Sequence, residues 1–141
     1  MRCHVVGLPH TQTNKTYSMC AYTEKVRKFC NMMTSLGHEV ILYGANPKEN
    51  EANVKEFVSC ITKLEQKKEG FNGPDDYQNI FFSNDLPIWE VFNPRVIKSL
   101  QKRVQPRDFI CIINGIVGKP VADAFPENMS VEFGIGYGGT F

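Results

Sequence analysis

The order of apolar patterns over residues 1–45 constrains the fold more than any other feature of this chain. A short β-branched run at 3–7 ends in Gly-Leu-Pro, which predicts a buried strand. Over residues 18–36 the apolar positions recur at spacings of three and four, typical of one helix face, and Gly37 supplies a left-handed cap. A second apolar run at 38–45 predicts another strand. Together they predict a βαβ unit with parallel strands and a right-handed crossover.

The same alternation continues to the end of the chain. Residues 57–61 fit either a strand or the start of a helix, and we prefer a strand followed by a short charged helix. Asn93 and Pro94 predict a helix start, as an N-cap with proline at the first helical position. The remaining expectations are the charged helix at 63–69, a loop at 70–79, a short apolar piece at 80–82, a helical turn near Pro87, a buried strand at 108–114, a helix at 119–125 and a strand at 129–133.

These elements predict one α/β domain over residues 1–141, with a doubly wound, mainly parallel, Rossmann-like sheet of about five strands. The chain is 42% hydrophobic with a formal net charge of +1, which argues against disorder and against a nucleic-acid partner. It has no run of about 18 apolar residues, so no membrane-spanning helix is expected. The apolar stretch at the N-terminus stops at Gly7, too early for a signal peptide, so we expect a cytoplasmic protein.

The cysteines fit a reducing compartment. They are odd in number, widely spaced and mostly within apolar segments, so we expect all of them to be reduced core residues. No CxxC pair is present, and we expect no metal site. The five are Cys3, Cys20, Cys30, Cys60 and Cys111.

The segment after the first predicted strand is the first candidate for a binding site. Ligands of open α/β sheets bind at the carboxyl ends of the strands, and residues 10–17 are polar throughout and lead into a helix N-terminus. This connection is longer than the usual 2–6 residues. Its neutral donors and acceptors suit a sugar, and the other interpretation is a solvated connector with a Thr or Ser cap. His10 could act as a base or orient a hydroxyl, although a lone loop histidine more often does neither, whereas His4 is expected to be a satisfied core histidine.

Three further features allow more than one interpretation. Residues 134–139 match GxGxxG after a predicted strand, but the helix and acidic residue of a dinucleotide site do not follow, so the motif is weak evidence for NAD. Glu132 could contact a ligand or another domain, and we favour an exposed position on an edge strand. The helix near 94–107 carries Arg95, Lys98 and Lys102 on one face, which fits a solvated face better than an anionic membrane surface.

The chain resembles the N-terminal domain of GT-B-fold glycosyltransferases, in a group of phage- and bacterium-type proteins. The likeness covers nearly the whole chain, and residues 1–45 resemble the opening βαβ unit of that family. The motifs that carry it are Gly7-Leu8-Pro9-His10-Thr11-Gln12, Leu36-Gly37-His38-Glu39-Val40, Ile113-Asn114-Gly115, Lys119 to Pro126, and Val131-Glu132-Phe133-Gly134-Ile135-Gly136-Tyr137.

The resemblance implies sugar transfer from a nucleotide-sugar donor to a hydroxyl acceptor, with no other cofactor. In that family the donor binds mainly to a C-terminal domain, which is absent here, so we expect this chain to be an incomplete enzyme that binds donor poorly. Self-association through an exposed interdomain surface is also expected. The resemblance leaves catalytic residues unassigned and places these residues at the cleft: Gly7, His10, Gln12, Asn14, Asn114, Gly115, Gly136 and Tyr137.

Two other functions are consistent with the sequence. The first is a stand-alone, non-catalytic α/β module that binds a nucleotide or a sugar phosphate. The second is a fragment of an NAD-dependent oxidoreductase, which depends on the glycine run alone.

Overall fold

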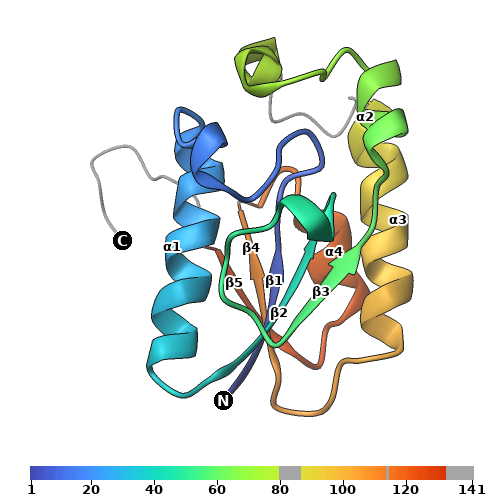
Figure 1. The fold of residues 1–141 in the computed structure, drawn as a ribbon. Helices are drawn as coiled ribbons and strands as arrows, with labels where there is room; N and C mark the ends of the chain where they lie inside the picture. Colours follow the sequence, from blue (N-terminus) through green and yellow to red (C-terminus); the bar gives the residue numbers. More distant parts are fainter. Residues whose placement is uncertain (80–86, 114, 133–141) are drawn as a thin grey trace.

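Five parallel strands form one sheet with helices on both faces (Figure 1). The computed structural model describes residues 1–79, 87–113 and 115–132. Every strand pairing is parallel and the order is β3-β2-β1-β4-β5, which confirms the predicted doubly wound, Rossmann-like α/β sheet. The strands are β1 (Arg2–Val6), β2 (Glu39–Gly44), β3 (Glu56–Ser59), β4 (Phe109–Ile112) and β5 (Met129–Glu132).

The helices divide between the two faces of the sheet. One face carries α1, and the other carries α3 and α4, which contact each other; α2 lies near one end of α3 (Figure 1). Short 3-10 turns occupy parts of the connections, including residues 74–79, where we expected a loop. The helices are α1 (Ala21–Ser35), α2 (Lys63–Lys68), α3 (Pro87–Gln101) and α4 (Lys119–Ala124), and the 3-10 turns are η1 (Lys15–Tyr17), η2 (Pro47–Glu49) and η3 (Pro74–Asn79).

Strand β1 is the centre of the core. It pairs with β2 on one side and β4 on the other, so that His4 lies opposite both Ile41 and Ile110. Because helices cover both faces, Cys3 to Val6 are buried, and apart from His4 these positions are apolar; Arg2, at the start of the strand, is half-buried. All five cysteines are buried and free, as predicted for core residues.

Helix α1 ends at the glycine that the sequence marks. Gly37 has a φ of 88°, its amide donates to the Thr34 carbonyl, and the His38 amide donates to the Met33 carbonyl. These two bonds form a Schellman motif, which confirms the predicted cap. The helix begins at Ala21 rather than near Ser18, because Lys15–Tyr17 forms η1.

The predicted helix start at Asn93 and Pro94 is wrong. Helix α3 begins at Pro87 and runs through Pro94. Its first two turns bury Ile88, Trp89 and Phe92, and this burial outweighs the roughly 3 kcal/mol that an interior proline costs. The Asn93 side chain does not cap the helix: its Nδ2 donates to the Val117 carbonyl at 2.9 Å.

Strand β5 lies at one edge of the sheet, and all four of its residues are exposed. Glu132 therefore has the exposed edge position that we favoured. Met129 and Val131 are among the exposed large hydrophobic residues. The expected self-association would use such a surface, and it stays a prediction.

Arg107 has a φ of 75°, the left-handed region that favours glycine. It follows Pro106 in a turn that the Asp108 amide closes by donating to the Gln105 carbonyl at 3.1 Å. We expect Arg107→Gly to raise the free energy of unfolding by about 0.5–1 kcal/mol, because relief of the strain exceeds the entropy that glycine adds to the unfolded chain. Urea unfolding would measure the change, and a loss of stability would show that the Arg107 side chain makes a compensating contact.

Candidate functional site

The connection between β1 and α1 begins at the point where the strand order reverses. In the sheet, β1 lies between β2 and β4. The chain passes from β1 to β2 on one side, whereas the chain after β4 continues to β5 on the other side, so the loops after β1 and β4 diverge at the carboxyl edge. Crevices at such a point are the usual ligand sites of doubly wound sheets. The loop after β1 contains four of the expected site residues, and the loop after β4 contains Gly115.

The polar residues of this loop are folded inward. His10, Thr11 and Gln12 are only 2–3% exposed, so this part of the loop is not a solvated connector, whereas Lys15 and Thr16 are exposed. The Thr11 hydroxyl lies 2.7 Å from that of Thr23 on α1, so the loop is tied to the helix that follows it. Burial of so many polar groups is costly unless each one is hydrogen-bonded.

Gln66 on α2 holds the loop from the other side. Its Nε2 donates to the Pro9 carbonyl at 2.9 Å, and its Oε1 accepts from Gln12 Nε2 at 2.7 Å. Gln66 is 2% exposed although it lies in a short charged helix. Sequence patterns do not predict the role of Gln66, because no apolar periodicity distinguishes it from its charged neighbours.

Several buried polar atoms of the loop have no hydrogen-bond partner in the described part of the chain. They are both ring nitrogens of His10, Oε1 of Gln12 and Oδ1 of Asn14. The other amide atoms of the two residues are used: Gln12 Nε2 donates to Gln66, and Asn14 Nδ2 donates to the Glu49 carbonyl at 2.8 Å. The unsatisfied oxygens of Gln12 and Asn14 therefore belong to side chains that a hydrogen bond already holds in place.

The environment of His10 favours its neutral form. Burial lowers the pKa of His10 to about 3, and its ring lies 5.4 Å from that of Phe71. A neutral imidazole offers one donor and one acceptor. Because its conjugate acid is so strong, this ring is a weak base, and the geometry favours the orientation of a hydroxyl over proton abstraction.

The two described glycines of the expected site have different surroundings. The Gly7 amide donates to the Tyr43 carbonyl at 2.8 Å, and a Cβ at Gly7 would lie 3.0 Å from that oxygen. Gly7 thus allows the loop to leave the sheet close to β2. Gly115 is exposed, and a Cβ there would lie 3.7 Å from Glu132 Oε2. Asn114, Gly136, Tyr137, the apolar piece at 80–82 and the glycine run at 134–139 lie outside the described residues.

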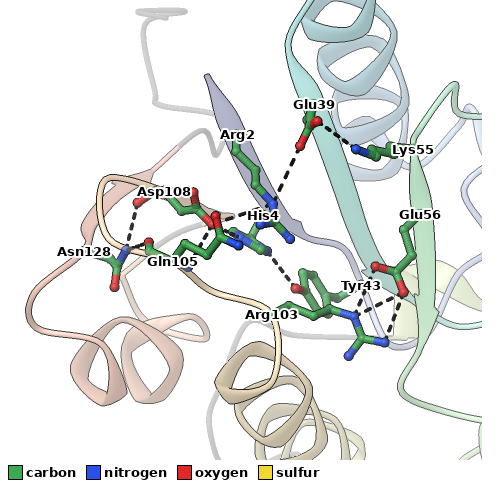
Figure 2. Close-up of polar contacts among 10 residues, drawn as sticks. All are labelled: Arg2, His4, Glu39, Tyr43, Lys55, Glu56, Arg103, Gln105, Asp108 and Asn128. Atoms are coloured by element: carbon green, nitrogen blue, oxygen red, sulfur yellow. Dashed lines mark hydrogen bonds and ion pairs between the residues drawn. The ribbon is translucent and has the colours of Figure 1, made fainter.

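A second polar cluster, formed by His4, Tyr43 and Asp108, lies within the core (Figure 2). His4 Nε2 lies 2.7 Å from Asp108 Oδ2, and His4 Nδ1 lies 2.7 Å from the Tyr43 hydroxyl. Burial lowers the pKa of His4, so the neutral ring donates from Nε2 to the carboxylate and accepts from Tyr43 at Nδ1. His4 and Tyr43 have no exposed surface, which confirms His4 as a satisfied core histidine.

Charged side chains surround this cluster and join the strands to the segment between α3 and β4. Arg103 pairs with Glu56 at 3.1 Å, and Arg2 lies 3.8 Å from Asp108 (Figure 2). Of the basic face expected on α3, Arg95 is paired with Glu65 at 2.7 Å, and these hydrogen bonds lower the pKa of Glu65 to about 2. The Arg95 side chain is therefore held in an ion pair with a residue of α2. Lys98 and Lys102 are exposed.

Comparisons with protein-family models, curated proteins and solved structures found no match to this chain. Among the residues that the structure describes, no group of three or more His, Cys, Asp or Glu side chains is arranged to hold a metal ion. No helix in the same residues has the length and hydrophobicity needed to cross a membrane.

Proposed function

We propose that the loop after β1 binds a hydroxyl-rich ligand, and that the domain supplies the acceptor side of a GT-B-type glycosyltransferase. The observation that supports this proposal is the set of unsatisfied polar atoms on His10, Gln12 and Asn14 at the reversal point of the sheet. Each unsatisfied group costs about 1–3 kcal/mol, so a ligand that satisfies these groups is favoured.

The chemistry of the unsatisfied atoms favours a sugar over a phosphate. The amide oxygens of Gln12 and Asn14 only accept hydrogen bonds, so the ligand must donate to them. A sugar hydroxyl both donates and accepts, whereas an ionised phosphate only accepts. The need for a hydrogen-bond donor favours a sugar acceptor over the alternative of a nucleotide or sugar phosphate.

On this proposal, transfer of the sugar needs a second lobe that holds the nucleotide-sugar donor. The resemblance assigns the donor contacts to that lobe, which would face the carboxyl edge of this sheet. The chain itself then binds the hydroxyl acceptor, and nucleotide sugars bind to it weakly.

An NMR titration of the ¹⁵N-labelled chain tests the proposal. The ligands are the methyl glycosides of glucose, galactose, mannose and N-acetylglucosamine. We expect at least one of them to shift the side-chain amide signals of Gln12 and Asn14. Gln12→Leu should weaken that binding, because it removes an acceptor, while the matched control Gln101→Leu at an exposed position on α3 should not. Circular dichroism checks that both variants are folded.

The same titration includes inorganic pyrophosphate and UDP as competing ligand classes. If these shift the loop signals and no glycoside does, the phosphate-binding module replaces the acceptor domain as the function. If no ligand moves the loop signals, the loop is not a binding site.

A further inference from the structure

A cavity lies between α3 and α4, on residues that the proposed sugar site does not use. It has a volume of about 250 Å³. Its rim is formed by exposed residues, while two side chains at its base, Trp89 and Asn93, are 2% and 5% exposed. The lining residues are Trp89, Glu90, Asn93, Pro94 and Pro120.

Both buried side chains have an unsatisfied polar atom. Trp89 Nε1 and Asn93 Oδ1 are buried and have no hydrogen-bond partner in the described part of the chain. The amide of Asn93 has a defined orientation, because its Nδ2 donates to the Val117 carbonyl at 2.9 Å. Oδ1 is therefore the free acceptor, and the indole N–H is a free donor.

Pro94 also lines this cavity. It lies inside α3 and has no amide hydrogen, so it cannot make the helical hydrogen bond to the Glu90 carbonyl. An interior proline is unfavourable in a helix, and its usual consequence is a carbonyl that needs another donor. The Trp89 N–H and the Asn93 acceptor come from consecutive turns of one helix.

These groups together indicate the kind of molecule that fits. A hydroxyl can accept from the indole N–H and donate to Asn93 Oδ1, whereas a carboxylate would meet the Asn93 acceptor and the nearby Glu90 side chain. The proline rings and the indole offer apolar walls to the rest of the molecule. The volume exceeds the roughly 30 Å³ share of one water several times.

We propose that the cavity between α3 and α4 binds a small neutral molecule that carries a hydroxyl group on an apolar body. The hydroxyl accepts from Trp89 Nε1 and donates to Asn93 Oδ1, and the apolar body lies against Pro94 and Pro120. This site is independent of the sugar site, since the two share no residue.

Cyclohexanol is a suitable probe, and Trp89 is the only tryptophan of the chain, so its indole N–H gives a single NMR signal. We expect cyclohexanol to shift this signal saturably, while cyclohexanecarboxylate, which has the same ring and a negative charge, does not. Trp89→Phe removes the donor and should weaken cyclohexanol binding about three- to tenfold. Because this variant has no indole signal, its binding is measured from the backbone amide signal of Glu90. The matched control Lys98→Gln, at an exposed position on α3, should bind as the wild type does.

A second variant keeps the test decisive if Trp89→Phe fails to fold. Pro94→Ala removes part of the apolar wall and should also weaken cyclohexanol binding, while the added helical hydrogen bond to the Glu90 carbonyl favours the fold. The proposal is overturned if cyclohexanol leaves the indole signal unmoved, if the carboxylate binds equally well, or if the folded variants bind with wild-type affinity. In the first case the cavity holds only water.

Discussion

His10→Phe is expected to stabilise this protein, and to stabilise it more as the pH falls. The ring nitrogens of His10 are buried without partners in the described part of the chain, so their removal costs no hydrogen bond. The pKa of His10 is about 3 in the folded protein, against about 6.5 when unfolded, so the unfolded state takes up a proton first. The wild type therefore loses about 1.4 kcal/mol per pH unit from this residue as the pH falls from 6.5 toward 3.

Urea unfolding at several pH values measures this difference. At pH 7 we expect a gain of about 1–2 kcal/mol for His10→Phe, from the removal of unsatisfied polar atoms. At pH 4.5 the gain should be about 3 kcal/mol larger, because the variant escapes the protonation cost over two pH units. Gln12→Leu is the matched control, since it alters the same loop without removing a titrating group. Parallel pH profiles for His10→Phe and the wild type would contradict the prediction.

The same substitution separates stability from binding. If His10 orients a ligand hydroxyl as proposed, His10→Phe gives a more stable protein that binds its sugar more weakly. A side chain kept at a cost in stability is typical of a functional site. A variant that gains stability and retains full affinity would show that Gln12 and Asn14 bind the ligand without His10.

Asp108→Ala is expected to have the largest destabilising effect, about 3–4 kcal/mol at pH 7. The Asp108 carboxylate accepts from His4 Nε2 at 2.7 Å and from the Gln105 amide at 3.0 Å, and it lies 3.8 Å from Arg2 Nε. Alanine leaves the His4 donor unpaired in the core, and hydrogen bonds to charged groups contribute about 1.5–3 kcal/mol each. Chemical unfolding followed by circular dichroism would give the change.

Tyr43→Phe provides the comparison for Asp108→Ala. It removes only the hydroxyl that donates to His4 Nδ1, so we expect a cost of about 1–2 kcal/mol. The two effects should not add in the double variant, because both residues act on one imidazole. Equal costs for the two single variants would show that the carboxylate contributes no more than a neutral partner.

Local patterns were sufficient to predict most of the fold. The spacing of Val26, Cys30 and Met33 and the cap at Gly37 define α1, and the β-branched runs on either side of it define β1 and β2. These features depend on residues that are near one another in the sequence. The failure at Pro94 has the opposite cause, since the burial of Trp89 and Phe92 against the rest of the molecule overrides the local preference of proline.

The candidate site was predicted less completely, for a related reason. The loop at 7–14 was found because its length and polarity are unusual for a connection between a strand and a helix. Its burial depends on Gln66, which contacts Gln12 across 54 residues of sequence, and no local pattern indicates that contact. The two partners of His4 are 39 and 104 residues away from it, so the sequence could indicate a buried histidine but not what satisfies it.

The position of β1 between β2 and β4 also determines the order in which the sheet can be completed during synthesis. Strands β1 and β2 are both present once residue 44 has been made, but the other neighbour of β1 begins at Phe109. Until β4 has been synthesised, β1 is an edge strand with one row of backbone groups unpaired, and His4 lacks the Asp108 carboxylate that accepts its hydrogen bond. Nascent chains that stall between these points therefore present an open, apolar strand edge, which is a known route to aggregation.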